Sequence, residues 1–239
     1  MIVLGIDTSG YANAVGVVTD GRILADVAFE ARTDSLEKIV VNIDDVLRSA
    51  GRTLGDIDGI GVGLGPGSWT GIRVGVTVGK ILAFSAGKKV AGISTLEALA
   101  YGARDESASV CAVIGTGAGN AVYAACYRVR DGELTLDGDY YVGPAAGLAE
   151  TVTDTTVLVG SWAAAYAKEI EREMNNARVH IVAMEAAPGG AAIALLAERR
   201  LERGDSDDAL SLTPLYLKES TAKALVQQRA EKKKTWGKG

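Results

Sequence analysis

The sequence predicts an α/β protein of two related lobes, each with a mixed β-sheet flanked by helices. Two observations lead to this prediction. A pattern typical of an antiparallel β-meander occurs twice, in residues 4–31 and in residues 109–142, and each time alternating helix-like and strand-like segments follow it. The 239-residue chain also has a hydrophobic content of 48%, which is enough for a substantial core. The repeat lies in the order of the elements, since the halves share no residue-level identity.

The first half begins with the meander, whose β-rich runs are separated by the turn sequences DTSG and TDG. A helix is expected over residues 35–50, because apolar residues recur there at helical spacing. Asp34 and Glu37 have the spacing of a capping box at its start, and Gly51 is a stop signal at its end.

A glycine-rich loop, GPGSWTGIRVG at residues 65–75, joins a strand-like run to a helix expected over residues 71–86. The Pro66-Gly67 pair predicts a type II turn, and Ser68 or Thr70 is expected to cap the helix. The alternative is that backbone amides of this loop hold an anion at the helix N-terminus. The sequence leaves both interpretations open.

The remaining segments continue the alternation. In the first half a strand is expected at residues 89–94 and a helix from Ser94, which Glu97 would complete as a capping box. In the second half the pattern predicts strands at 109–115, 121–130 and 133–142, a helix at 144–151, a strand at 155–161, a helix at 162–176, a strand at 178–184 and a helix from Pro188 to about Arg203.

Histidine is nearly absent, and this limits the chemistry that the chain can support. The single histidine, His180, lies in a strand-like run, and the zinc patterns HExxH and CxxC are missing. The nucleophile elbow GxSxG and the phosphate-loop patterns GxxxxGK[ST] and GxGxxG are missing as well. We therefore expect no metal site and no phosphate loop of either kind.

A weaker nucleotide or anion site is the chemistry that remains. Two turns and the glycine-rich loop offer backbone amides and short polar side chains, which equally well form ordinary turns and caps. The candidate residues are Asp7, Thr8, Ser9, Gly65, Gly67 and Ser68, with the GTGAG turn at residues 115–119 as a second place of the same kind.

Small residues form a continuous stripe along the helix expected over residues 71–86. At 100° per residue Gly71, Gly75 and Gly79 line up with Ala83 and Gly87. Each interior glycine costs a helix about 1 kcal/mol relative to alanine, so the stripe predicts the close approach of another backbone. That backbone belongs either to the chain's own sheet and 35–50 helix or to a partner.

Cysteine usage and charge suggest where the protein works. Cys111 and Cys126 lie in apolar runs and are expected to be buried, reduced thiols, which indicates an intracellular, cytoplasmic protein. No uncharged apolar run approaches membrane-spanning length, so no membrane association is expected.

The C-terminal segment is basic. Residues 218–239 hold seven Lys or Arg against two Glu, a local charge of +5, and the other 217 residues carry −10. Such a tail is either solvated or a contact to nucleic acid.

Four motifs, in their order and spacing, carry a resemblance to a known family. LGIDTS near the N-terminus, GVGLGPGSWTGIRVG, VAGISTLEALA and TPLYLK near the end resemble the bacterial TsaB (YeaZ) proteins over nearly the whole chain. The resemblance implies an actin-like (ASKHA) fold with two ribonuclease H-like lobes. With it, residues 1–106 are expected to form the first lobe, 107–205 the second, and 206–239 a return segment and basic tail. The chain departs from the family pattern at residues 33–35 and 115–117.

The resemblance also implies a function in tRNA modification. It points to a non-catalytic scaffold subunit of the complex that transfers a threonylcarbamoyl group to adenosine next to the tRNA anticodon. The catalytic subunit would be a TsaD-like partner, which carries an HxxxH metal motif after its own GPG loop. The corresponding stretch here, from Lys80 to Glu97, has no histidine. The implied assembly is a heterodimer joined by a TsaE-like ATPase, with tRNA bound through the complex, ATP used by the complex, no cofactor of the chain itself, and a possible homodimer when the chain is alone.

A partner interface follows from the resemblance, because family heterodimers pair the two helices that correspond to residues 35–50 and 71–86. The expected interface residues are Ile39, Val40, Ile43, Val46, Leu47, Gly71, Gly75, Gly79 and Leu82. The main alternative function is an actin-fold ATP-dependent phosphotransferase that would use IDTSG and GTGAG for ATP. A peptidase and a plain nucleic-acid binder are weaker alternatives.

Overall fold

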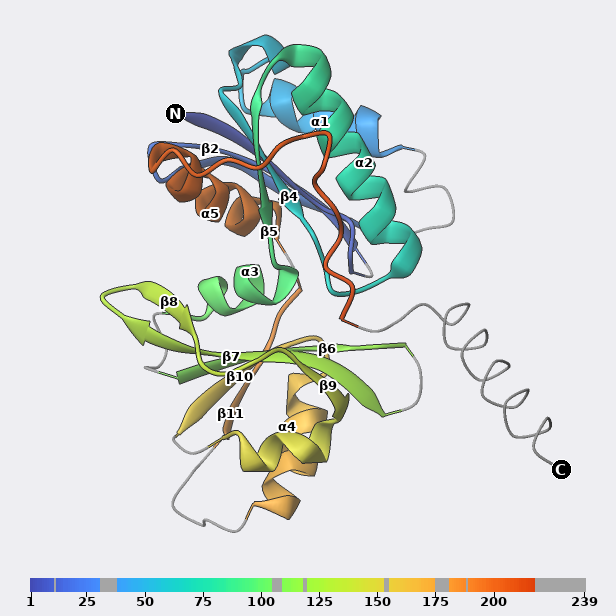
Figure 1. The fold of residues 1–239 in the computed structure, drawn as a ribbon, viewed down its shortest axis with the longest axis vertical. Helices are drawn as coiled ribbons and strands as arrows, with labels where there is room; N and C mark the ends of the chain where they lie inside the picture. Colours follow the sequence, from blue (N-terminus) through green and yellow to red (C-terminus); the bar gives the residue numbers. More distant parts are fainter. Residues whose placement is uncertain are drawn as a thin grey trace, which may run out of the picture.

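Two β-sheets of the same topology form the centre of the molecule (Figure 1). The structure, a computed structural model, describes residues 1–10, 12–30, 38–104, 109–117, 120–152, 155–174, 181–187 and 189–217. The strand orders are β3-β2-β1-β4-β5 and β11-β10-β6-β7-β8, with β9 paired to β7. In each sheet an antiparallel meander is extended by two parallel strands, so the predicted pair of related lobes with mixed sheets is confirmed.

The first sheet begins with the predicted meander. Its strands are β1 Ile2–Asp7, β2 Ala12–Thr19, β3 Arg22–Glu30, β4 Gly59–Gly63 and β5 Lys89–Ile93. Asp20 and Gly21 form the turn between β2 and β3 with φ of 50° and 74°, the left-handed conformation that a two-residue hairpin of this kind requires. The turn sequence TDG therefore sets the pairing of β2 with β3 next to the turn, and a β-bulge between Val17 and Val18 shifts the register beyond it.

The second sheet differs from the prediction in one strand. Its strands are β6 Ser109–Gly115, β7 Ala121–Arg130, β8 Glu133–Leu136, β9 Tyr141–Pro144, β10 Thr156–Gly160 and β11 Ile181–Glu185. The single strand expected over residues 133–142 is divided into β8 and β9, which pair with different parts of β7. Gly138 lies between them with a φ of 88°, a conformation that interrupts a regular strand. The following segment is the 3₁₀ helix η2, Ala145–Glu150.

Helices cover both faces of the first sheet. The helices are α1 Ile39–Ser49, α2 Trp69–Ala86, α3 Thr95–Gly102, α4 Ala163–Glu173 and α5 Gly190–Glu202, with a short 3₁₀ helix η1 at Leu54–Asp56. Residues alternate along β1, so Leu4 and Ile6 pack in the cluster that contains α1 and α2, while Val3 packs in the cluster that contains α5. The first sheet is thus the middle layer of three (Figure 1).

Two helices pack on the sheet of the other half of the chain. Leu96 and Leu99 of α3 lie in one cluster with Val110 and Ala112 of the second sheet. Conversely, α5 packs on the first sheet, where a side chain at Gly5 would meet the backbone nitrogen of Ala194 at 2.6 Å. The division expected at residue 106 therefore separates the two sheets but not the helices that cover them.

The return segment after α5 runs along the first sheet, beside α2. Asp207 donates its backbone N–H to the carbonyl oxygen of Val90 at 2.8 Å, and Leu215 donates to Leu64 at 2.9 Å. The Lys80 ammonium of α2 donates to the carbonyl oxygens of Leu210 and Leu212 at 3.0 and 2.8 Å. The first lobe thus holds the last described residues of the chain in place.

Three local predictions are corrected by the structure. The cysteines are not free thiols, because the register of β6 and β7 puts Cys111 and Cys126 directly opposite one another and a disulfide joins them. The Pro66-Gly67 pair does not form a type II turn, since the Gly65–Pro66 peptide is cis and Gly67 has a φ of 157°. Ser94 precedes α3 but its side chain makes no capping hydrogen bond.

Other local predictions hold or lie outside the described residues. Ser68 caps α2, accepting a hydrogen bond from Gly71 N at 3.3 Å, and Gly51 ends α1 with a φ of 66°. Asp34, Glu37 and His180 lie outside the described residues. Within the part of the chain that the structure describes, no helix combines the length and the apolar character needed to cross a bilayer.

Candidate functional site

The loops that the sequence singled out meet at one edge of the first sheet. The strands β1, β4 and β5 are parallel, so their carboxyl ends lie side by side. Asp7, Thr8 and Ser9 leave the end of β1, the glycine-rich loop follows β4, and Thr95 follows β5. All four polar side chains are buried, with at most 2% of each residue exposed.

The Asp7 carboxylate is the centre of this junction. Asp7 Oδ1 accepts hydrogen bonds from Ser9 N at 2.7 Å and Ser9 Oγ at 2.5 Å, and Asp7 Oδ2 accepts one from Thr95 Oγ1 at 2.8 Å. Burial raises the pKa of Asp7, and the hydrogen bonds from Ser9 and Thr95 offset part of that rise. Since α3 packs on the second sheet, Thr95 links the two lobes through this carboxylate.

The glycine-rich loop is fastened to the same residues. Ser68 donates its backbone N–H to the Ser9 carbonyl at 2.7 Å, and Thr95 donates its backbone N–H to the Gly65 carbonyl at 2.9 Å. Gly67 must lack a side chain, because a Cβ there would collide with the backbone of Ser9. The Thr8 hydroxyl donates to the carbonyl oxygen of Gly71 at 2.6 Å. The six candidate residues thus lie close together, and hydrogen bonds join the loop after β1 to the glycine-rich loop.

This arrangement does not fit an open anion site. The Ser9 amide and hydroxyl, the Thr8 hydroxyl and the Ser68 amide all donate to protein oxygens. A phosphate at this edge would have to displace those bonds and would also approach the buried Asp7 carboxyl group. We derive no nucleotide chemistry from these residues.

The glycine stripe of α2 faces the chain's own sheet. A Cβ at Gly71 would collide with the Thr8 carbonyl oxygen, one at Gly75 with the Thr8 hydroxyl, and one at Gly79 with the Val62 side chain. The expectation that these three glycines lie in a partner interface is therefore wrong. The close approach that the stripe predicted is real, but β1, β4 and the first turn make it.

Most of the α1 residues expected at the interface are also buried in the chain's own core. Ile39, Ile43, Val46 and Leu47 have 2–3% of their surface exposed, because this side of α1 packs on the first sheet. Leu82 of α2 is half-buried in the same cluster. Of the expected set only Val40, which is 55% exposed, points outward.

An outward apolar face does exist on the two helices, formed by other residues. We call it the α1–α2 outer face, and it consists of Val40, Val41, Ile81 and Phe84, which are 55%, 59%, 59% and 68% exposed. Sequence reasoning missed the last three as interface residues. The signal was present, since Ile81 and Phe84 lie on the side of α2 opposite Gly75 and Gly79, and that side should be polar on a helix with only one covered face.

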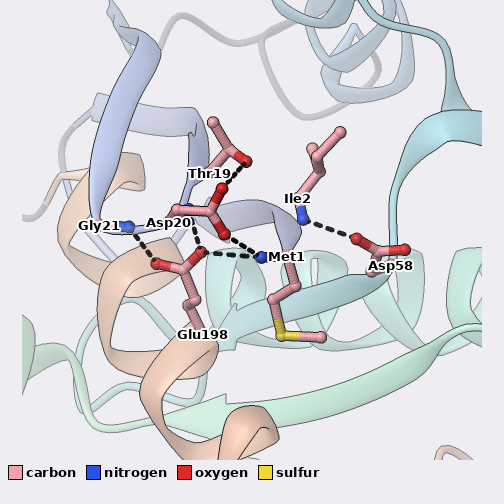
Figure 2. A network of polar contacts seen from close by, with 7 residues as sticks. All are labelled: Met1, Ile2, Thr19, Asp20, Gly21, Asp58 and Glu198. Carbon is pink, nitrogen blue, oxygen red and sulfur yellow. Dashed lines mark hydrogen bonds and ion pairs between the residues drawn. The ribbon is translucent and has the colours of Figure 1, made fainter.

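Three carboxylates, those of Asp20, Glu198 and Glu202, lie close together beside the N-terminus and could supply oxygen ligands to a cation. Asp20 and Glu198 already have partners, which Figure 2 shows. Glu198 accepts from the backbone N–H groups of Asp20 and Gly21 at 2.7 and 2.9 Å, and the Met1 ammonium lies 2.6 Å from Asp20 Oδ1 and 3.8 Å from Glu198 Oε1. The cluster is therefore a clamp that ties α5 to the turn between β2 and β3.

A cavity of about 620 Å³ lies at the carboxyl ends of β10 and β11 in the second lobe. Its lining is Ser161, Trp162, Ala164, Ala165, Ala186 and Ala187. Trp162 is 66% exposed and has a φ of 69°. Of the expected GTGAG turn, Gly115 ends β6 near the Tyr166 hydroxyl, and Ala118 and Gly119 lie outside the described residues.

Comparison with known proteins gives consistent matches. A family model described as TsaD, tRNA N6-adenosine threonylcarbamoyltransferase, matches residues 29–226. The chain is 33% identical over 134 residues to the tRNA threonylcarbamoyladenosine biosynthesis protein TsaB of Escherichia coli, a match covering 55% of the chain and 58% of that relative. It is 28% identical over 228 residues to the protein of the same name from Haemophilus influenzae, covering 91% and 94%.

Solved structures confirm the fold. YeaZ from Pseudomonas aeruginosa superposes with a TM-score of 0.76 at 28% identity, over 90% of this chain and 99% of that one. A ROK hexokinase from Thermus thermophilus matches with a TM-score of 0.53 at 15% identity, over 85% of this chain and 100% of that one, a likeness of fold alone. The expected actin-like arrangement of two lobes is confirmed.

Proposed function

Because the chain belongs to the TsaD family of tRNA N6-adenosine threonylcarbamoyltransferase proteins, and within it to the TsaB (YeaZ) group, we propose that it is a non-catalytic subunit of the complex that makes threonylcarbamoyladenosine in tRNA. In this proposal it binds a TsaD-like catalytic subunit as a heterodimer and supports it. A TsaE-like ATPase joins the assembly, in the cytoplasm, and tRNA is bound by the complex as a whole.

The α1–α2 outer face is the observation that carries the proposal. Four large apolar side chains stand exposed on two neighbouring helices, where burial in a complex would stabilise by about 1.5–3 kcal/mol for each fully covered side chain. Scattered exposed apolar residues are ordinary, but a group of them on adjacent helices is typical of a protein interface. We therefore place the contact with the TsaD-like subunit on this outer face rather than on the glycine stripe.

The residues of the chain indicate which parts of the reaction the other subunits would carry out. It contains one histidine, so a metal site built on a histidine pair must come from the partner. The loops at the end of β1 are closed by their own hydrogen bonds, and we assign ATP to the assembled complex rather than to this subunit. When the partner is lacking, the same outer face would pair two copies of the chain.

Reconstitution with the TsaD-like protein of the same organism tests the proposal. Wild type should elute with the partner as one species in size-exclusion chromatography, and tRNA modification should require both chains. Phe84→Asp should lose the heterodimer while keeping its melting temperature. Trp162→Asp is the matched control, because Trp162 is equally exposed but lies on the second lobe. Pairing that survives Phe84→Asp would move the interface elsewhere, and ATP-dependent phosphorylation of a small substrate by the isolated chain would favour the phosphotransferase.

A further inference from the structure

The outer edge of β3 is the longest strand edge without a partner in the part of the chain that the structure describes. β3 has nine residues and stands at the end of the first sheet, where only β2 pairs with it among the described residues. The edge strands of the second sheet, β8 and β11, have four and five residues. An open strand edge presents a row of backbone N–H and C=O groups that can pair with another strand.

The opposite edge of the same sheet is covered by the chain itself. The return segment lies along β5, where the backbone N–H of Asp207 donates to the Val90 carbonyl at 2.8 Å and Asp207 Oδ2 accepts from Gly92 N at 2.8 Å. Proteins protect the edges of their sheets in this way, or with proline and lysine in the edge strand. β3 has neither residue and no such cover among the described residues, so it is suited to pairing.

Apolar side chains are exposed along β3. Ile23, Leu24 and Val27 are 56%, 37% and 36% exposed. The bulge opposite Val17 and Val18 disturbs only the part of β3 next to the turn, and residues 25–30 pair with β2 in one unbroken register. This regular segment is therefore the part of the edge that a further strand can extend.

The side chains of the regular segment alternate between the two faces of the sheet. Ala25 and Phe29 pack against the cluster that contains α1, and Val27 lies between them on the same face. Asp26 is on the other face, where its Oδ1 accepts a hydrogen bond from Ala191 N of α5 at 3.0 Å. Any strand added to β3 must match this pattern on both faces.

A second copy of the same segment matches it. In an antiparallel pair of identical strands related by a two-fold axis, one residue lies opposite its own copy. With Val27 at the axis, Ala25 lies opposite Phe29 and Asp26 opposite Ala28, so each larger side chain meets a small one and no like charges are directly opposed. A register shifted by two residues toward the turn would place Asp26 opposite itself, which is destabilising.

We propose that β3 pairs antiparallel with β3 of a second copy of this chain, in the register that sets Val27 opposite Val27. The five-stranded first sheets of the two copies would then join into one continuous sheet. The contact uses a strand edge and not the α1–α2 outer face. The inference therefore goes beyond the function proposed above and does not rest on it.

Disulfide cross-linking of the full-length chain tests this register. Val27→Cys would bring two thiols together across the axis, because opposed residues of an antiparallel pair have Cα atoms about 4.5–5.5 Å apart, a span that a disulfide bridges. Oxidised glutathione supplies the oxidant: the two thiols lose their protons and two electrons to form the disulfide, and the glutathione disulfide is reduced to two thiols. We expect a covalent dimer on a non-reducing gel.

Ile23→Cys is the matched control for the cross-link. Its position is more exposed than that of Val27. It lies four residues from the axis, so its two copies would be roughly 26 Å apart and should not join. Cys111 and Cys126 are joined to each other and do not compete. A covalent dimer that forms equally with both variants, or with neither, would overturn the proposal.

Charges placed at the axis give an independent measurement. Every chain in this experiment also carries Phe84→Asp, so that the α1–α2 outer face does not contribute to pairing. Val27→Lys and Val27→Glu should each weaken self-association by on the order of tenfold in sedimentation equilibrium, because each sets two like charges opposite one another. An equal mixture of the two variants should pair again. This rescue shows that both variants fold, and a mixture that associates no better than either variant alone would contradict the register.

The outcomes separate this inference from the proposed function. If the TsaD-like subunit binds and Val27→Cys does not cross-link, the inference fails while the proposed function stands. If Val27→Cys cross-links and the TsaD-like subunit does not bind, the inference stands and the proposed function fails. A Val27→Lys chain that loses the TsaD-like subunit, with a wild-type chain that shows no self-association, would assign the β3 edge to that subunit and overturn the inference.

Discussion

The two sides of α2 both lack a polar face in the sequence, and they have opposite roles in the structure. The inner side carries Gly71, Gly75 and Gly79 and touches the first turn and β4 with its backbone. The outer side carries Ile81 and Phe84, both more than half exposed. A stripe of small residues shows that something approaches the helix closely, but it does not show whether the approaching element is the protein's own sheet or another molecule.

The difference predicts which substitutions damage the fold and which damage only binding. Residues on the inner side are fixed by packing that exists in the isolated chain, so their replacement should lower its stability. Residues on the outer side have no such packing to lose. Their replacement should leave the stability of the isolated chain unchanged and weaken only the binding of the partner.

The largest effect is expected for Gly75→Leu on the inner side. A Cβ alone would collide with the Thr8 hydroxyl, and the rest of the leucine would break the hydrogen bond from Thr8 to the Gly71 carbonyl. Overpacking of this kind costs about 3 kcal/mol or more, which exceeds the gain of about 1 kcal/mol from replacing a helical glycine. We expect the melting temperature of the isolated chain to fall by roughly 4–8 °C, measured by circular dichroism.

Thr77→Leu is the matched control for this prediction. It introduces the same side chain two residues further along α2, at an exposed position. Its melting temperature should stay within a few degrees of wild type. If Gly75→Leu were as stable as this control and lost only its partner, the inner side of α2 would be an interface after all.

The next effect is expected for Ile81→Arg on the outer side. Placing a charge where an apolar contact is buried in a heterodimer should weaken binding of the TsaD-like subunit by about 2 kcal/mol, or roughly 30-fold. The isolated variant should melt like wild type, because Ile81 is 59% exposed. Isothermal titration with the partner measures the affinity, and Leu210→Arg, another exposed apolar position, is the control. Equal affinities for the two variants would contradict the assignment of this face.

The sequence predicted most of the elements and their order, but not the division of residues 133–142 into β8 and β9, nor how the elements pack against distant parts of the chain. Hydrophobic periodicity and turn residues located the two meanders and the helices, because these are local properties. The exchange of α3 and α5 between the sheets could not be foreseen, since both helices are buried on most sides and their sequences do not show which sheet each one covers. Likewise, an apolar run shows that Cys111 and Cys126 are buried, but only the register of β6 and β7 brings them together.

The candidate site was predicted in part for the same reason. Asp7, Ser9 and Ser68 were singled out because short polar residues beside glycines form tight turns or anion sites, and the sequence does not separate the two. The structure adds Thr95, which the sequence analysis had not named, because its contact with Asp7 spans 88 positions of the chain. Through that contact the polar groups that could have bound an anion are hydrogen-bonded to one another instead.

A smaller effect is expected when the link between the lobes is removed by Thr95→Val. The substitution keeps the shape of the side chain and removes the hydroxyl that donates to Asp7 Oδ2 at 2.8 Å. Leaving a buried carboxylate oxygen without this donor should cost about 1–3 kcal/mol of unfolding free energy, measured by urea denaturation. Ser85→Ala is the control, since its hydroxyl makes an exposed bond of 3.4 Å to Leu82. A Thr95→Val variant as stable as this control would show that Thr95 does not hold the lobes together.

The smallest effect is the contribution of Asp7 to the pH dependence of the unfolding free energy. It reports directly on the hydrogen-bonded junction of Asp7, Ser9 and Thr95. Burial raises the folded-state pKa of Asp7 above its unfolded value. The sign follows from linkage: a raised pKa means that the folded state binds the proton more tightly. The stabilisation is therefore fully present below the unfolded pKa of about 3.9 and is lost as the pH rises through the folded pKa.

Asp7→Asn should remove this dependence while keeping the junction intact. The amide oxygen of the asparagine can still accept hydrogen bonds from Ser9 N and Ser9 Oγ. Its amide nitrogen can donate to Thr95 Oγ1, whereas in the wild type Thr95 Oγ1 donates to Asp7 Oδ2. The unfolding free energy of the variant minus that of wild type should thus increase with pH and level off above the folded pKa, in urea titrations from acid to neutral pH. Asp56→Asn should give the opposite slope, because hydrogen bonds from Thr53 lower the pKa of Asp56 and its stabilisation is lost as the pH falls. A difference for Asp7→Asn that decreases with pH would mean that the junction favours the charged carboxylate, and an open, solvated edge suited to a bound cation would then describe the inner end of α2 better than a closed one.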